Sequence, residues 1–213
     1  GVKDALSGAS SSVYVPMSAG ESISDMLTKM KEKALAASDT SLDTTSRTAL
    51  NTDFQAVRDQ ITKTVQNATF KGINLLDGSL PGLEALASAD GISRMTVMTQ
   101  KLSLSGGVVM LSTTSGFTSA TSASLLLTSI DDSINNVSAS LAQMGTSSKA
   151  LEAHETFIGK LQDSITAGIG NLVDADLAKE SAKLQSLQTK QQLGIQALSI
   201  ANQAPQLVLS LFK

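Results

Sequence analysis

The chain has 213 residues and a formal net charge of −3, with no cysteine, no tryptophan and one histidine. The missing cysteines exclude thiol nucleophiles, disulfide bonds and cysteine-ligated zinc or iron–sulfur centres, and one histidine excludes a metal site built from several imidazoles. The acidic balance provides no basic surface for nucleic acid or anionic lipid. Because 41% of the residues are hydrophobic but only 3% aromatic, the core must be aliphatic, which favours long helices packed side by side.

The front of the chain is predicted to contain one amphipathic helix. Apolar residues in 21–38 recur at intervals of three and four, and the stretch ends in a run of serine, threonine and aspartate that breaks helices. Residues 2–18 are a poorer helix candidate, because Gly8 and Pro16 interrupt them.

A second amphipathic helix is predicted at about 43–67, where it carries part of a coiled-coil seam. Asp43 or Ser41 can cap its first turn. Its apolar residues alternate at intervals of four and three, namely Leu50, Phe54, Val57 and Ile61. The short connection to the first helix predicts an antiparallel pair.

Helical periodicity stops in the middle of the chain, where short strands are predicted instead. The stretches 83–87 and 92–98 flank an Asp90-Gly91 pair, which is a strong signal for a hairpin turn. A further pair of strands, 101–104 and 108–111, is predicted around the next two glycines. The serine- and threonine-rich segment that follows, 112–124, is predicted to be a solvated loop.

The coiled-coil seam returns at about residue 122 and continues to about 172, with a polar gap at 146–148. Four of its residues are Ile130, Ile134, Val137 and Leu141. A further helix is predicted from about 174 to 203. Helical sequence therefore brackets a short β segment.

The end of the chain is apolar on most sides of the predicted helix, so it requires burial on most sides. Its length fits a membrane span, but several amides and Pro205 make it too polar for lipid, and no membrane insertion is expected. Burial would gain about 1.5–3 kcal/mol for each large side chain. We therefore expect an assembly to bury Leu193, Ile195, Leu198, Ile200, Leu207, Leu209, Leu211 and Phe212.

No group of residues in the sequence predicts catalysis. His154 falls on the seam between Leu151 and Ile158, a position that favours a structural role. The neighbouring carboxylates Asp131 and Asp132 resemble charge near a helix N-terminus more than a glycosidase pair. Neither an enzyme nor a cofactor is predicted.

Three motifs in this sequence resemble those of bacterial flagellins. Residues 198–212, LSIANQAPQLVLSLF, resemble the family's terminal motif, and 67–78 are similar to its T-x-F-N-G-x-x-L-L-x-G turn with Lys71 in place of the usual asparagine. Residues 174–181, DADLAKES, resemble the acidic start of its C-terminal helix. The run 29–39 looks most like flagellins of alpha-proteobacterial type.

The resemblance implies a mainly α fold with a small β-hairpin region, an elongated rod of long antiparallel coiled-coil helices. Residues 1–70 and 122–175 would form the rod, 71–121 an outer region, and 176–213 a helix in the filament core. The implied function is a structural subunit of the extracellular flagellar filament, which self-assembles for motility. Two alternatives are a hook–filament junction protein and a secreted module that binds glycans or surfaces.

The resemblance also implies partners and a modification. The partners are other flagellin subunits, a flagellar export chaperone, the type III export apparatus, the filament cap and hook-associated proteins. Flagellins of several bacteria carry O-linked glycans on exposed hydroxyls. The candidates for glycosylation here are Ser112, Thr113, Thr114, Ser115, Thr118 and Ser119.

Two departures from the family pattern lead to further expectations. A flagellin should begin with several dozen more residues, which form the N-terminal half of the inner coiled coil, so this form is expected to lack that segment and not to polymerise normally. Weak activation of animal flagellin receptors is expected too, because Lys29 and Lys33 stand where receptor-activating members carry arginine and leucine.

Overall fold

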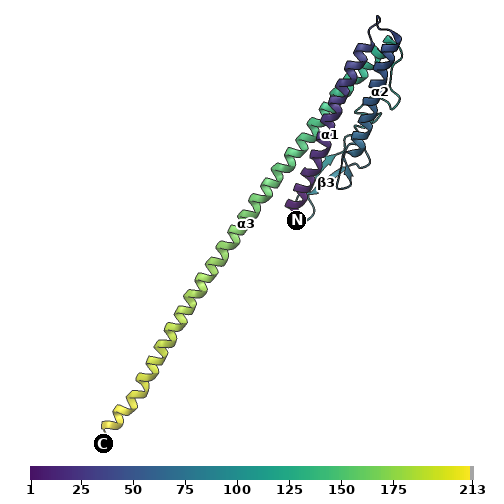
Figure 1. Cartoon of the computed structure of the whole chain (residues 1–213). Helices are drawn as coiled ribbons and strands as arrows, with labels where there is room; N and C mark the ends of the chain where they lie inside the picture. The colour runs from purple at the N-terminus through teal and green to yellow at the C-terminus, as the bar shows by residue number, and fades with distance from the viewer. Residues whose placement is uncertain (212–213) are drawn as a thin grey trace. The chain divides into compact units, whose positions relative to one another are not determined.

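The computed structural model describes residues 1–211, with side chains placed as far as residue 201. Three helices make up most of it: α1 (Val2–Ala37), α2 (Thr44–Asn67) and α3 (Ala120–Leu211) (Figure 1). Four short strands lie between α2 and α3 in the chain: β1 (Thr69–Phe70), β2 (Ile73–Asn74), β3 (Gly82–Leu86) and β4 (Arg94–Met98). The predicted fold class, mainly α with a small antiparallel β-hairpin region, is confirmed.

The chain divides into two units after Gly159. The first unit contains α1, α2, the strands and the beginning of α3, and it holds the hydrophobic core. The second unit begins at Lys160 and consists of the rest of α3 as far as the structure describes it. In the described part of the chain, no helix has both the length and the hydrophobicity that crossing a membrane requires.

The first helix begins much earlier than the sequence predicts. The expectation that residues 2–18 form a poor helix is wrong, because α1 runs through Gly8 and Pro16. Proline costs about 3 kcal/mol inside a helix and glycine about 1 kcal/mol. Complete burial of Leu6 and Val13 on the same stretch offsets this cost, since each contributes about 1.5–3 kcal/mol.

The second helix begins at Thr44, and Asp43, not Ser41, is its N-cap. The Asp43 carboxylate accepts hydrogen bonds from the backbone N–H of Ser46 (2.9 Å) and from its hydroxyl (2.7 Å). These bonds stabilise the ionised form, and they hold the pKa of Asp43 below its usual value. The end of α1 before the serine-, threonine- and aspartate-rich run, and the position of α2 as its antiparallel neighbour, agree with the predictions from the sequence.

Arg47 closes the connection between α1 and α2. Its guanidinium donates hydrogen bonds to three backbone carbonyl groups of the connection, those of Ala37 (3.0 Å), Asp39 (2.9 Å) and Leu42 (2.9 Å). The last carbonyl groups of a helix lack intrahelical partners, and here the Arg47 side chain supplies the hydrogen-bond donors. The planar fork of arginine suits several acceptors at once.

The eight predicted seam residues all lie against the core of the first unit. Phe54, Ile61, Ile130 and Val137 are completely buried, and Leu50, Val57, Ile134 and Leu141 are partly buried. Two ion pairs tie α1 to its neighbours: Lys33 to Asp53 on α2 (3.1 Å) and Lys31 to Asp131 on α3 (2.7 Å).

The first hairpin, β1–β2, closes through a two-residue turn. Phe70 pairs with Ile73, and the two residues between them have positive φ, 50° at Lys71 and 79° at Gly72. A type I′ turn requires this combination. Just beyond the turn, the buried Asn74 donates its side-chain N–H to the carbonyl of Val65 (2.7 Å), which fixes the hairpin to the end of α2.

The predicted hairpin around Asp90-Gly91 is confirmed, whereas the predicted strand pair after it is wrong. β3 and β4 are antiparallel, with Leu83 opposite Val97. The second pair reduces to one isolated parallel bridge between Leu104 and Val109.

The segment before α3 is held in place, so the prediction of a solvated loop over 112–124 is wrong for most of it. Phe117 is buried, and its ring lies edge-on to Phe54 at 5.3 Å. The amide oxygen of Asn51 accepts the backbone N–H of Phe117 (2.8 Å), and Arg58 donates to the carbonyl of Ser115 (2.7 Å). α3 then begins at residue 120.

The helices predicted as separate after residue 122 form one continuous helix, α3. The predicted boundary between 172 and 174 does not interrupt it, and the polar stretch at 146–148 is also helical. Thr146 and Ser147 donate their hydroxyls to the carbonyls of Ala142 (2.9 Å) and Gln143 (3.1 Å), so these hydroxyls bond within the helix and do not end it.

Candidate assembly surfaces

The second unit presents a stripe of apolar side chains that has no partner within the described residues. Every described side chain from Lys160 onward is exposed. Leu161, Ile165, Ile169 and Leu172 follow one another at intervals of four, four and three, which is a coiled-coil spacing, and they are 43–73% exposed. We call this set and its continuation toward Ile200 the second-unit stripe. Exposed apolar surface on this scale is typical of an interaction site.

The residues predicted to assemble lie at the far end of this helix. Leu193, Ile195, Leu198 and Ile200 are 59–69% exposed. Leu207, Leu209 and Leu211 belong to α3, but their side chains lie outside the described part, and Phe212 lies outside the described residues altogether. The described members therefore occupy a helix that leaves them accessible to another chain.

The first unit has a polar link between α1 and α3. The hydroxyl of Tyr14, the one tyrosine of the chain, donates to the carboxylate of Glu152. This bond to a negative charge raises the pKa of Tyr14, because it stabilises the neutral hydroxyl.

His154 lies half-buried on α3 and connects it to the β3–β4 hairpin. Its Nε2 is 2.7 Å from the carbonyl oxygen of Ala87, so that nitrogen carries the proton and donates. Ala87 in turn donates its N–H to the carbonyl of Ser93 across the hairpin (2.9 Å). The histidine therefore holds the loop end of the hairpin, next to Leu86 at the end of β3, a contact that sequence alone did not indicate.

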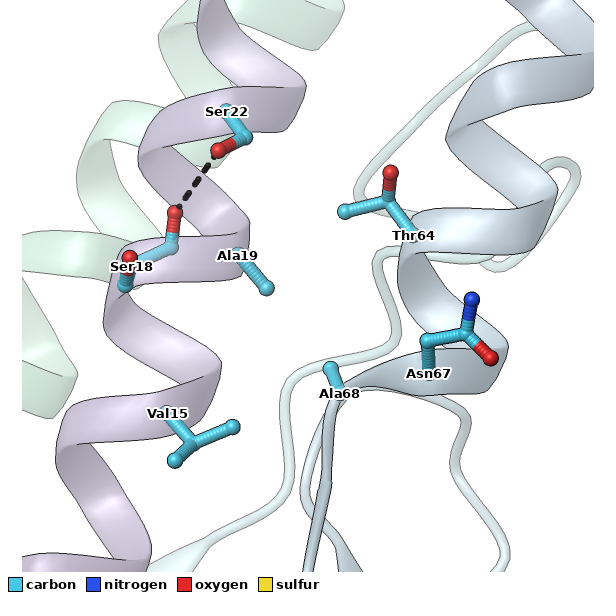
Figure 2. A pocket seen from close by; sticks show the side chains of 7 residues that line it. All are labelled: Val15, Ser18, Ala19, Ser22, Thr64, Asn67 and Ala68. Carbon is cyan, nitrogen blue, oxygen red and sulfur yellow. Dashed lines mark hydrogen bonds between the residues drawn. The ribbon is translucent and has the colours of Figure 1, made fainter.

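A groove lies between α1 and the end of α2 (Figure 2). Its volume is about 380 Å³. Val15 and Ala19 point into it from α1, and Thr64 and Asn67 line it from α2, with Ala68 below them. The groove thus combines small apolar side chains with hydroxyl and amide groups.

The six hydroxyls singled out for glycosylation differ in their surroundings. Ser112 and Ser115 are partly buried, and their hydroxyls take part in a small hydrogen-bond network. Ser119 caps the start of α3 together with Ser122. Ser119 is exposed, as are Thr113, Thr114 and Thr118.

Several residues that organise these surfaces were not found from the sequence. Asn51, Arg47 and Arg58 act on backbone groups that only the tertiary fold brings near, so no local signal marks them.

Among the residues that the structure describes, no group of three acidic or imidazole side chains is placed to bind a metal ion.

Comparison with known proteins places the chain in a family. The N-terminal helical region of bacterial flagellin matches residues 1–80, and the C-terminal helical region matches residues 127–212. Flagellin FljM of Caulobacter vibrioides is 56% identical over 212 residues, covering 100% of this chain and 77% of that protein. A flagellin of Brucella melitensis is 34% identical over 225 residues, covering 100% and 78%.

A solved structure agrees with these sequences. The crystal structure of Bacillus cereus flagellin matches 71% of this chain and 86% of its own, with a TM-score of 0.63 at 20% identity, so it shows the shared fold. The chain therefore belongs to the bacterial flagellins, of the type found in alpha-proteobacteria, and it is a structural subunit of the extracellular flagellar filament.

Proposed function

We propose that the end of the second-unit stripe, from residue 176 onward, packs into the core of the filament, while the first unit contacts neighbouring copies around it. The exposure of Leu193, Ile195, Leu198 and Ile200 supports this proposal above all. Burying four such side chains would gain about 6–12 kcal/mol per subunit, before the entropic cost of association. In this division, residues 1–70 and 122–175 form the outer helical body, 71–121 face outward, and 176–213 form the core helix.

A matched pair of substitutions tests the role of the stripe. Leu198→Asp places a charge in the proposed core, whereas Gln196→Asp places the same charge on a neighbouring polar position of α3. In longer subunits that contain this chain, filaments should be lost or greatly shortened for Leu198→Asp and should persist for Gln196→Asp, as measured by sedimentation and electron microscopy. Equal assembly of the two variants would refute the proposed core contact.

We propose further that the apolar end of α3 is also what an export chaperone binds before the subunit enters the type III apparatus. Exposed leucines and isoleucines support this, since a free chain must keep them from aggregating. The filament cap and hook-associated proteins would meet the same end during assembly. In a pull-down, deletion of 193–213 should abolish chaperone binding, and unchanged binding would exclude this site.

We infer that the filament subunit works without catalysis or a cofactor. Support comes from the family, whose function is structural, and from His154, which is engaged with a backbone carbonyl.

O-glycosylation is proposed for the segment 112–119, at the candidate hydroxyls Ser112, Thr113, Thr114, Ser115, Thr118 and Ser119. Exposure favours the threonines over the two partly buried serines. Intact-mass spectrometry of protein from native filaments should show mass above that of the bare chain, and the bare mass alone would refute the modification.

A further inference from the structure

The tip of the β3–β4 hairpin holds an isoleucine out into solvent. Ile92 is 82% exposed, the highest value of any large hydrophobic side chain that the structure describes. A single exposed apolar residue on a surface needs no explanation. Ile92 differs because the residues around it fix its position.

A network of hydrogen bonds holds the tip in one conformation. The carboxylate of Asp90 accepts the backbone N–H of Ile92 (3.0 Å) and the hydroxyl of Ser88. That hydroxyl also accepts the N–H of Ser93 (3.0 Å), and Gly91, with φ of 78°, donates to the carbonyl of Ser88 (3.2 Å). A tip that is already ordered loses little conformational entropy when it binds, so its isoleucine is suited to act as a docking knob.

The same chain carries a matching hollow, the groove between α1 and α2 (Figure 2). Val15, Ala19 and Ala68 provide small apolar groups that leave room for a branched side chain of four carbon atoms. The hydroxyl of Thr64 can meet backbone groups of the tip, and that of Ser22, which donates to the carbonyl of Ser18 (3.1 Å), can still accept a hydrogen bond. A volume of about 380 Å³ exceeds what an isoleucine side chain needs.

Charges beside the groove and beside the tip are complementary. Glu21 adjoins the α1 lining and Lys63 adjoins the α2 lining, and both are exposed. Asp90 and Arg94 stand two residues to either side of Ile92, and both are exposed as well. Arg94 is already paired with Glu84 across the hairpin (2.9 Å), so the attraction that favours docking is the one between Asp90 and Lys63.

We propose that Ile92 of one copy docks in the α1–α2 groove of a neighbouring copy of this chain. The occupant is a second copy because the chain is a filament subunit, so other copies are its established partners. A knob and a hollow on different parts of one chain form a heterologous contact. Such contacts, when the rotation between copies does not close a ring, produce open helical polymers.

Disulfide trapping tests this contact directly, because the chain contains no cysteine of its own. One variant carries Ile92→Cys and a second carries Ser22→Cys, each within a longer subunit that contains this chain, and filaments are assembled from a mixture of the two. Mild oxidation should give a disulfide-linked dimer on a non-reducing gel, at several times the yield from Ile92→Cys mixed with Thr45→Cys. Thr45 is an exposed control on α2 that does not line the groove. Mixed filaments that form but give no more dimer than the control would overturn the proposal.

Substitution of the knob gives a second and independent measurement. Ile92→Val keeps the apolar contact, whereas Ile92→Asp places a charge in the groove. Neither substitution should unfold the protein, because the Ile92 side chain is 82% exposed. Assembly measured by sedimentation should be normal for Ile92→Val and impaired for Ile92→Asp. Equal assembly of both variants, with circular dichroism spectra like the unsubstituted chain, would contradict the docking while leaving the filament function intact.

Discussion

The β1–β2 turn stores backbone strain that a single substitution should relieve. Lys71 occupies the first of two positions with positive φ, a conformation that costs a residue with a side chain about 1–2 kcal/mol. Asparagine tolerates it better, because its short amide bonds to the local backbone. Lys71→Asn should therefore stabilise the first unit.

The size of the effect follows from two opposing contributions. Relief of strain should contribute about 1–1.5 kcal/mol. The ammonium of Lys71 lies 5.5 Å from the centre of the Phe70 ring, and the loss of this exposed cation–π contact should cost about 0.5 kcal/mol. The net gain is about 0.5–1 kcal/mol, which for a chain of this size raises Tm by about 1–4 °C.

The assay is thermal and urea unfolding of Lys71→Asn beside two controls. Lys71→Met removes the ammonium but keeps a side chain in the strained position, so it should be slightly destabilising. Gly72→Ala introduces strain at the neighbouring position, where φ is 79°, and should destabilise by about 1 kcal/mol. A Lys71→Asn protein no more stable than Lys71→Met would refute the assignment of strain to this residue.

Three other predictions concern the polar contacts of the first unit. Arg47→Lys should lower the free energy of unfolding by about 1–3 kcal/mol, because an ammonium cannot reach three separate carbonyls, and urea titration measures this loss. Glu152→Gln should lower the pKa of Tyr14, and ultraviolet absorbance reports this change cleanly because the chain has no other tyrosine and no tryptophan. The folded-state pKa of Tyr14 is raised, so the stability that its bond to Glu152 contributes is present below the unfolded-state pKa and is lost as pH rises through the folded-state pKa. The folded-state pKa of Asp43 is lowered, so the stability from its cap is present above the unfolded-state pKa and is lost as pH falls through the folded-state pKa. Asp43→Asn should keep the cap and weaken the dependence of Tm on acid pH. An unaltered acid dependence of Tm would show that Asp43 is not its source.

Local signals in the sequence predicted those elements whose cause is local. The α2 helix has a capping aspartate and a regular seam, and the β3–β4 hairpin has its Asp90-Gly91 turn, so both agree with the structure. The start of α1 is not predicted because Pro16 lowers helix propensity, whereas the burial that outweighs this effect comes from tertiary packing. Propensity is a weak guide wherever tertiary packing decides.

Contacts between distant parts of the chain could not be predicted in the same way. The segment before α3 looks like a loop because it is rich in serine and threonine, yet Asn51 and Arg58 hold it from positions more than fifty residues earlier. The candidate core helix was found because residues apolar on all sides are visible in the sequence. Ile92 was placed in the expected hairpin, but its exposure follows from the hydrogen bonds at the tip.

A density map of filaments that contain this chain, at a resolution that shows side chains, would locate these contacts. We predict that Leu193 and Leu198 are buried between copies in the core, and that Ile92 of one copy lies against Ala19 and Ala68 of the next. A map in which Leu193 and Leu198 face solvent on the filament exterior would contradict the central claim that the second-unit stripe drives assembly.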